Sequence, residues 1–378
     1  MRFVQSAHLG SFLTLCLCVL ANGSFPIATA QASQLYTVTD LGSYLAAPAI
    51  AINNQGTVLL GNSLYSNGQT QVLPQPTGGV FTAQALNDLG QVAGFVNFSG
   101  AYNYDLALYS QGSLNVMTNL SGLDPTAINN SGQISGDSLL NYQMFLYLKG
   151  SLTAIGPLPG RGESASRGMN AAGEVIGISD DNSGNSQGFF FSNGKATLIQ
   201  TPGVESEVSA INNLGQIVGD YALSQNSAGD HVFVFDGGKI QDLGIALNLP
   251  DEEDAAAAIN DSGFVVGNAE IPTGLDAWIY RPGSGFTNLN SLISPASGWA
   301  LQSAIDINNN GQIIGFGMHN GQFDDFLLTP APEPSGLALL GMGLLAAGTV
   351  ARSARARISA AEKRIALREL LQKGVKRR

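Results

Sequence analysis

The sequence predicts an all-β fold, a closed propeller of seven blades over residues 33–330. Two observations predict the blades: one short motif recurs seven times, and apolar runs of strand length follow each copy. A third observation predicts how the ring closes, since a spare strand precedes the first copy of the motif. The full prediction adds a signal peptide before this body and a transmembrane helix with a basic tail after it.

The repeated motif is Ile-Asn-x-x-Gly followed by a β-branched pair and a second Gly, in seven near-copies. The steps between copies are 34, 42, 41, 42, 48 and 48 residues. A repeat of about 40–50 residues is typical of propellers and solenoids, because one small sheet cannot bury its apolar face alone. The first Asn of each copy is Asn53, Asn87, Asn129, Asn170, Asn212, Asn260 and Asn308.

One unit is clearest over 208–244, where VSAIN, GQIVGDYAL, HVFVFDGG and KIQDLG are separated by turn residues. Short runs rich in Val, Ile and Phe between Gly, Asn and Asp indicate strands, so four strands fit one unit. The Asn-Asn-x-Gly segment is then a hairpin turn in which Gly215 takes the left-handed conformation. Turn chemistry explains the repeated Asn residues better than catalysis does.

The third strand of each unit carries aromatic residues, as in FFFSNG (189–194) and VFVFDGG (232–238). An aromatic stripe can be a ligand platform, but bulky residues between packed sheets are the ordinary core of this fold, and core is the expectation here. The first unit is shorter. LYSNG (64–68) is expected to merge two strands into one, which would explain the 34-residue step.

Closure follows from the two ends of the body. The seventh unit runs from DINNNGQIIG through FDDFLLTP into a Pro-rich linker and lacks a fourth strand. LYTVTDLG (35–42) matches KIQDLG (239–244) in its closing Asp-Leu-Gly. We expect this N-terminal strand to complete the seventh blade, because that pairing removes two exposed sheet edges.

The N-terminus has the features of a secretory signal peptide, assigned to 1–32. Arg2 precedes an apolar run over 9–20, and Ala28 and Ala30, or Ala30 and Ala32, supply an A-x-A cleavage site. The apolar run is too short to favour a membrane anchor. Both cysteines, at 16 and 18, lie in this segment, so the mature body has no disulfide, thiolate metal site or Cys nucleophile.

The C-terminus reads as a linker (331–335), an apolar span (336–351) and a basic tail (352–378). The span is short but sufficient for a transmembrane helix, and the basic residues after it place the C-terminus in the cytoplasm. A buried core helix is the alternative for the span. The tail is either a basic helix on the anionic inner leaflet or a solvated segment without a partner.

Two resemblances arise from these segments. Pro332-Glu333-Pro334, the apolar span and the cluster Arg352, Arg355 and Arg357 resemble a PEP-CTERM sorting signal. The repeats, best over 210–244 with His231, resemble HAF-type extracellular repeats. These resemblances imply export, anchoring in the inner membrane until an exosortase-type enzyme cuts near Pro332, and delivery to the cell surface or matrix. Neither resemblance implies a reaction.

Charge separates the body from the tail. Residues 32–330 hold 6 Lys or Arg against 25 Asp or Glu, a net charge of −19, whereas 336–378 hold 10 against 2, a net charge of +8. The acidic body excludes nucleic acid as a partner, because phosphate binding requires a basic surface. Acidic loops on an exported protein make calcium binding a hypothesis to consider. The segment 180–185 lacks the terminal Glu of a calcium loop, so no metal or cofactor is expected. The acidic run at 251–254 is expected to be a solvated loop.

No catalytic site emerges from the motifs. After signal removal only His231 and His319 remain, and His231 is expected at a tolerated surface or inter-strand site. A nucleophile elbow or metal pair is not recognisable. The prediction is therefore a non-catalytic, exported propeller that binds exopolysaccharide or matrix proteins. The alternatives are a polysaccharide-cleaving enzyme with paired carboxylates and a structural spacer.

Overall fold

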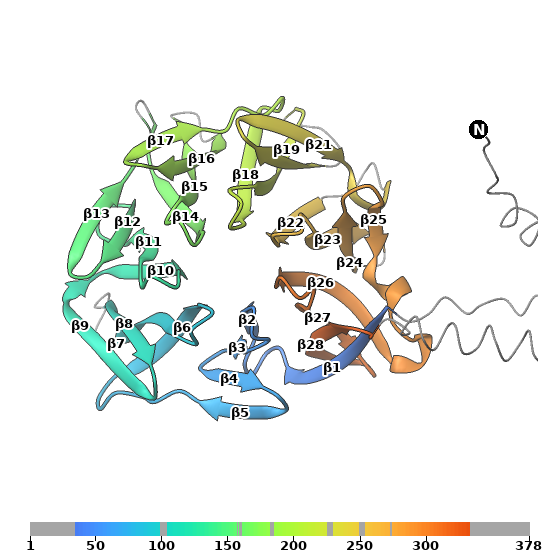
Figure 1. The fold of residues 1–378 in the computed structure, drawn as a ribbon, viewed down its shortest axis with the longest axis horizontal. Helices are drawn as coiled ribbons and strands as arrows, with labels where there is room; N and C mark the ends of the chain where they lie inside the picture. The colour runs from blue at the N-terminus through green and yellow to red at the C-terminus, as the bar shows by residue number, and fades with distance from the viewer. Residues whose placement is uncertain are drawn as a thin grey trace, which may run out of the picture.

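A computed structural model of the chain describes residues 35–332 except 99–103, 157, 159–160, 182–184, 225–229, 249–253 and 273. Seven four-stranded antiparallel sheets lie around a central axis as the blades of a propeller (Figure 1). The predicted all-β, seven-bladed fold is confirmed. The segments assigned to the signal peptide and the C-terminal helix lie outside the described residues, and within the described ranges no helix is long and apolar enough to cross a membrane.

The blades are numbered in chain order, and the strands of each blade are given from the innermost to the outermost. Blades 1 to 4 contain β2 (Ala49–Ile52), β3 (Val58–Leu60), β4 (Ser63–Ser66) and β5 (Gln69–Val72); β6 (Val80–Leu86), β7 (Val92–Asn97), β8 (Tyr104–Ser110) and β9 (Ser113–Ser121); β10 (Leu123–Ile128), β11 (Ile134–Ser138), β12 (Gln143–Leu148) and β13 (Ser151–Ile155); and β14 (Ser164–Met169), β15 (Val175–Asp180), β16 (Ser186–Ser192) and β17 (Lys195–Leu198). Blades 5 to 7 contain β18 (Glu205–Ile211), β19 (Ile217–Ala222), β20 (His231–Asp236) and β21 (Lys239–Gly244); β22 (Asp254–Ile259), β23 (Val265–Ile271), β24 (Gly274–Arg281) and β25 (Gly285–Asn288); and β26 (Trp299–Ile307), β27 (Ile313–His319), β28 (Gln322–Pro330) and β1 (Tyr36–Ser43). Among the described residues, three short 3-10 helices lie in the connections on either side of blade 6: η1 (Ala246–Asn248), η2 (Leu289–Leu292) and η3 (Pro295–Ser297).

The ring is closed by the N-terminal strand. β1 pairs antiparallel with β28, from Tyr36 opposite Pro330 to Ser43 opposite Asp324, and so forms the outermost strand of blade 7. In Figure 1 the blue first strand lies beside the orange last strands. The predicted closure of the propeller by residues 35–42 is therefore confirmed.

The Asp-Leu-Gly sequence shared by β1 and β21 has a common structural role. Oδ1 of Asp40 accepts the N–H of Gly42 at 2.8 Å, and Oδ1 of Asp242 accepts the N–H of Gly244 at 2.8 Å. Both glycines have positive φ, of 99° and 84°, beside an irregularity in the pairing register. The motif marks a bulge near the end of an outermost strand.

Blade 1 corrects one expectation. The segment 64–68 does not merge two strands, because β4 and β5 are separate and joined by a two-residue turn in which Asn67 and Gly68 have φ of 51° and 78°. The short step to the second motif comes from short strands and connections. In this blade Leu60 of β3 stands where the other blades have the second motif Gly, and it faces Ser63 of β4. The small residue of the facing pair is therefore on the third strand here and not on the second.

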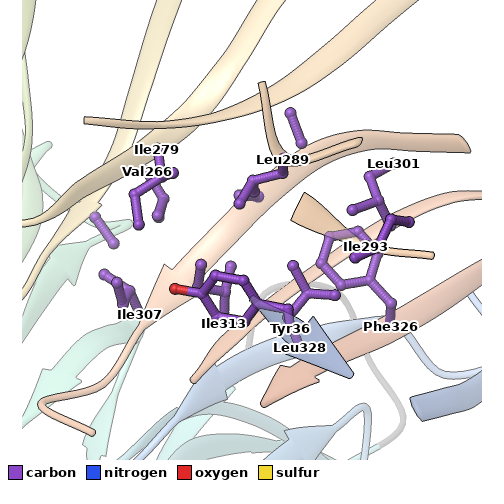
Figure 2. Packing of buried hydrophobic residues seen from close by; sticks show 13 residues of the cluster. Tyr36, Val266, Ile279, Leu289, Ile293, Leu301, Ile307, Ile313, Phe326 and Leu328 are labelled. Atoms are coloured by element: carbon purple, nitrogen blue, oxygen red, sulfur yellow. The ribbon is translucent and has the colours of Figure 1, made fainter. Parts of the chain in front are cut away.

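The apolar core lies mainly between neighbouring blades. Figure 2 shows the largest cluster, between blades 6 and 7, in which Tyr36 of the closing strand lies beside Leu328. Tyr36 is 3% exposed, so the first residue of β1 is anchored in the core as well as by main-chain pairing. Burial of this ring contributes on the order of 1.5–3 kcal/mol to closure.

The second motif Gly and the aromatic residue of the third strand form matched pairs. Gly219 faces Phe233, Gly267 faces Trp278 and Gly315 faces Phe326, and these three aromatic side chains are fully buried. A Cβ on Gly219 would lie 2.0 Å from the main-chain oxygen of Glu207 in β18. The aromatic stripe is therefore core, as expected, and the glycine is required by the close approach of the innermost strand.

This packing distinguishes two glycines in neighbouring blades. We expect Gly219→Ala to lower the free energy of unfolding by about 1–3 kcal/mol, because the new methyl group overlaps main chain that cannot move freely. Gly168→Ala is the control, since its Cβ would meet Ile176 at 3.7 Å, an ordinary contact, and Ala stands at the equivalent position 210. Denaturant titration of both variants measures the effect. Equal stability of the two would contradict this account of the second Gly.

Candidate functional site

The two ends of the propeller differ in how the strands are joined. One end carries the seven motif turns between the first and second strands of each blade, and we call it the motif face. The opposite end carries the connections between blades and between second and third strands, and we call it the loop face. Pro330 is at the motif face, where it lies 3.5 Å from the position of a Cβ on Gly311 in the seventh turn.

Each motif Asn shapes its own turn. In blade 5, Oδ1 of Asn212 accepts the N–H groups of Leu214 and Gln216 at 3.1 and 2.9 Å. The N–H of Gly215 donates to the main-chain oxygen of Asn212, and Gly215 has a φ of 79°. The predicted roles of Asn and Gly in this turn are confirmed, since a side-chain acceptor and a left-handed residue are both in use.

The seven Asn side chains also join the blades. Each Asn is 3–6% exposed, and its Nδ2 donates to the main-chain oxygen of the motif Asn in the next blade. These hydrogen bonds are 2.9–3.4 Å long and run Asn53 to Asn87, Asn87 to Asn129, Asn129 to Asn170, Asn170 to Asn212, Asn212 to Asn260, Asn260 to Asn308 and Asn308 to Asn53. They form an unbroken circle, which we call the asparagine ring.

A second circle lies beside it, built from the residues that follow the motif Asn. A main-chain N–H donates to the side-chain oxygen of the equivalent residue in the next blade at 2.8–3.0 Å in six places. The circle is interrupted at Ala171, which has no side-chain acceptor. Its members are Asn54, Asp88, Asn130, Ala171, Asn213, Asp261 and Asn309.

The channel mouth on the motif face is a polar hollow of about 180 Å³ lined by both circles. Its two carboxylates already have partners: Asp88 accepts from Asn54 and Asn130, and Asp261 accepts from Asn213 and Asn309. These polar groups are largely satisfied by one another. The polar residues that line the hollow are therefore explained by their structural role, which is to hydrogen-bond neighbouring blades to one another around the axis.

Because Asn212 belongs to the asparagine ring and Asn213 does not, substitutions at the two positions should differ in their effect on the free energy of unfolding. Asn212→Asp keeps the acceptor for the turn but loses the amide N–H groups that donate to the main-chain oxygen of Asn260 and to the side chain of Gln216. We therefore expect a loss of about 1–3 kcal/mol in the free energy of unfolding. Asn213→Ala copies the natural Ala171 and should stay within about 1 kcal/mol of the parent. Thermal and denaturant unfolding compare them. A larger loss in Asn213→Ala than in Asn212→Asp would refute the role of the ring.

A different pocket opens on the loop face, between blades 3 and 4. It also measures about 180 Å³, and it combines apolar side chains with acceptors. Its lining residues are Asp137, Ser138, Leu139, Tyr142, Glu163, Ser164, Ala165, Ile178 and Asp180. We call it the 3–4 pocket. Three carboxyl groups and no basic residue line it.

Tyr142 is in an unusual conformation at this pocket. It is a non-glycine residue with a φ of 55°, and it is 60% exposed in the connection between β11 and β12. Left-handed backbone costs an aromatic residue roughly 1–2 kcal/mol, and such strain is concentrated at functional sites. The N–H of Ser164, which also lines the pocket, donates to the main-chain oxygen of Tyr142 at 3.2 Å. Ser164 is 6% exposed, and its Oγ has no hydrogen-bond partner among the described residues.

The carboxyl group of Asp137 is perturbed. Burial raises its pKa to about 6, and the nearby Asp124 carboxylate adds to the rise, while the N–H of Ser166, which Oδ1 accepts at 2.7 Å, and the charge of Arg167 act in the opposite direction. Asp124 faces Asp137 directly across β10 and β11, and burial raises its pKa as well. The two groups hold a proton more readily than free carboxyls do.

This perturbation has a consequence for stability against pH. Since the pKa of Asp137 is about 6 in the folded state and 3.8 is the unperturbed value, its contribution is complete below about pH 4 and is lost as pH rises through 6. Asp137→Asn keeps the acceptor for Ser166, so we expect a gain of on the order of 1–3 kcal/mol at pH 8 and little change at pH 4. Urea titrations at both pH values measure it. An equal effect at the two pH values would exclude this cause.

The structure places the remaining predicted residues as follows. His231 forms an inter-strand pair with Asp242, with Nδ1 at 3.0 and 3.1 Å from the two carboxylate oxygens. In the calcium alternative at 180–185, Asp181 accepts from Asn185 instead, and 182–184 lie outside the described residues. Other predicted residues also lie outside the described residues: Ala28, Ala30, Ala32, Glu333, Pro334, Arg352, Arg355, Arg357 and the run 251–253.

Sequence reasoning missed the 3–4 pocket. Its residues come from three separated segments, 137–142, 163–165 and 178–180, that meet only when blades 3 and 4 pack together. A signal was nevertheless present: Leu139, Leu140 and Tyr142 place apolar side chains in a connection, and all three are exposed, at 38%, 73% and 60%. Exposed apolar groups next to carboxyls indicate a binding surface.

These features define the chain as a closed seven-bladed β-propeller with a lined pocket on one face. No protein-family model matches the sequence, and no curated protein matches it significantly. Among solved structures it is similar to the β-propeller domain of the trilobed protease from Pyrococcus furiosus, which has an open velcro topology (9% identity, TM-score 0.51, 78% of this chain and 93% of that one).

Two whole peptidases show the same likeness. They are a prolyl endopeptidase (11% identity, TM-score 0.54, 80% of this chain and 51% of that one) and the Pyrococcus horikoshii acylaminoacyl peptidase (8%, 0.50, 78% and 54%). The chain spans about half the length of each. At such identities the likeness concerns the fold alone. The closing strand β1 distinguishes this chain from the open form.

Proposed function

We propose that the protein is an exported, non-catalytic propeller that binds a glycan of the extracellular matrix in the 3–4 pocket. The observation that carries the proposal is the strained, exposed Tyr142 beside the carboxyl groups of Asp137, Glu163 and Asp180, which line the same pocket. An aromatic face packs against the C–H face of a sugar ring, and carboxylates and hydroxyls receive its hydroxyl groups.

The charges of the pocket restrict the class of glycan. Asp137, Glu163 and Asp180 line it without a basic residue, and the body around it is strongly acidic. A polymer of uronic acids would meet like charge, which costs affinity. The ligand is therefore a neutral polysaccharide or one that carries free amino groups.

The topology also supports surface delivery. The N–H of Ala331 donates to the main-chain oxygen of Leu35 at 2.8 Å, so both ends of the body meet at the motif face, opposite the 3–4 pocket. A PEP-CTERM tail that begins at Pro332 would hold the motif face toward the inner membrane and present the pocket outward. Recovery of the chain in the membrane fraction with residues 333–378, and at the cell surface without them, tests this part of the proposal.

A polysaccharide-cleaving enzyme remains the second candidate because of one observation. Asp124 and Asp137 face each other on adjacent strands, both with a raised pKa, and a carboxylic acid with a pKa near 6 is suited to general acid catalysis. Glycoside hydrolysis uses two carboxyl groups that flank the scissile bond; of this pair, Asp137 lines the 3–4 pocket and Asp124 does not. Release of reducing ends from a bound polymer, abolished in Asp137→Asn, would decide for this candidate.

The binding function predicts opposite effects on stability and affinity. Tyr142→Gly relieves the positive φ, so we expect a gain of up to roughly 1–2 kcal/mol in the free energy of unfolding. The same change removes the aromatic face, so retention on immobilised neutral or amino-sugar polymers should fall at least about tenfold. Affinity electrophoresis against the producing cell's exopolysaccharide, a neutral glucan, chitosan and alginate measures it.

Lys149→Gly is the matched control. Lys149 has a φ of 48° in the turn at the opposite end of β12, on the motif face, so this variant relieves the same strain away from the pocket. It should gain stability and keep full binding. Retention of binding in Tyr142→Gly, or the absence of binding to any of these polymers by the unmodified chain, would refute the proposed function.

A further inference from the structure

Three side chains with metal-binding atoms converge in blade 7, on the loop face. Nδ1 of His319 lies 3.1 Å from Oδ2 of Asp40 and 3.6 Å from Oδ2 of Asp324. One oxygen of each carboxylate and the imidazole nitrogen all lie within 4.8 Å of one another. The three residues come from β1, β27 and β28, and Asp40 is separated from the others by nearly the whole propeller in sequence.

These separations suit a metal ion. Ligand atoms about 2.0–2.2 Å from Zn²⁺ in a tetrahedral site lie about 3.3–3.6 Å from one another, close to the distances from Nδ1 to both carboxylates. One imidazole and two carboxylates supply a net charge of −2 when the imidazole is neutral. Nitrogen together with oxygen ligands favours a first-row divalent cation over Ca²⁺ or Mg²⁺, which prefer oxygen alone.

The surroundings hold the histidine in place. Trp299 stacks on the His319 ring with the centroids 4.5 Å apart and the planes 2° from parallel. Nδ2 of Asn320 lies 3.0 Å from Nε2 of His319. A half-turn of this amide would let its oxygen accept from Nε2–H, which fixes the tautomer that leaves Nδ1 free for a metal. Asp324 is 7% exposed, so its carboxylate is oriented by the packing of blade 7.

A comparison within the chain separates a metal site from an ordinary pair. In blade 5, Nδ1 of His231 lies 3.0 Å from Oδ2 of Asp242, close to the 3.1 Å between His319 and Asp40, and Asp242 stands in the same Asp-Leu-Gly sequence as Asp40. There Tyr221 donates to Asp242 and packs against the His231 ring. Among the described residues, no second carboxylate lies close enough to His231 and Asp242 to form a three-ligand group with them. Blade 7 therefore adds a carboxylate that the hydrogen bond alone does not need.

We propose that Asp40, His319 and Asp324 bind a divalent first-row cation, with Zn²⁺ as the probe, and that the bound ion fastens the closing strand β1 to blade 7. The ion would link β1 to β27 and β28 through side chains, in addition to the main-chain pairing of Tyr36–Ser43 with β28. Three protein ligands leave a fourth position for water. Binding of this ion stabilises the closed ring and is independent of the 3–4 pocket.

The test uses the full-length chain without a histidine tag, freed of metal by chelation. Isothermal titration should show one Zn²⁺ per chain, and Zn²⁺ should raise the melting temperature. Co²⁺ should develop the visible absorption of a four-coordinate site. Asp40→Asn retains an oxygen for the Gly42 N–H, and His319→Gln retains side-chain bulk, so both variants should fold yet bind Zn²⁺ at least about tenfold more weakly.

His231→Gln is the matched control and should leave the stoichiometry and affinity unchanged. Removal of residues 1–32, which contain His8, Cys16 and Cys18, distinguishes this site from Zn²⁺ binding by those side chains, and the shortened chain should still bind one ion. The proposal is overturned if the metal-free chain binds no Zn²⁺, or if binding is the same in Asp40→Asn, His319→Gln and the unmodified chain.

Discussion

The asparagine ring is the interaction on which the rest of the propeller depends. Each buried Asn side chain has one oxygen and one NH₂ group. In blade 5 the oxygen of Asn212 accepts within its own turn, whereas the NH₂ group donates both to Gln216 of the same blade and to Asn260 of the next blade. Seven equivalent bonds of about 1 kcal/mol each lie where the innermost strands are closest. The ring therefore couples the shape of each turn to the angle between blades, which explains why one residue type recurs in all copies.

Packing within and between blades follows from the same repeat. The second motif Gly lets the innermost strand approach, and the aromatic residue of the third strand covers the space that a side chain would occupy. Blade 1 shows that the pairing matters more than the identity, since Leu60 there faces the small Ser63. The closing strand inserts Tyr36 into this core, so the last blade is packed like the others.

The two faces then serve different purposes. The motif face is regular because its turns must satisfy one another around the axis, and its polar groups are consumed in doing so. The loop face has no such constraint, and there the 3–4 pocket and the cluster of Asp40, His319 and Asp324 are found. The ends of the body leave at the motif face, so a tail beginning at Pro332 is compatible with presentation of the loop face to the surroundings.

Local sequence was sufficient for the blade number, the strand order, the turn conformations and the closure, because these depend on short motifs that repeat. The expected merging of two strands over 64–68 in the first blade was wrong, since LYSNG allows either one strand or a hairpin and the structure has the hairpin of β4 and β5. Tertiary structure alone decided which carbonyl each Asn reaches, and it alone brought 137–142 to 163–165 and Asp40 to His319. Those contacts join residues of different blades or opposite ends of the chain, and the angle between packed sheets sets them.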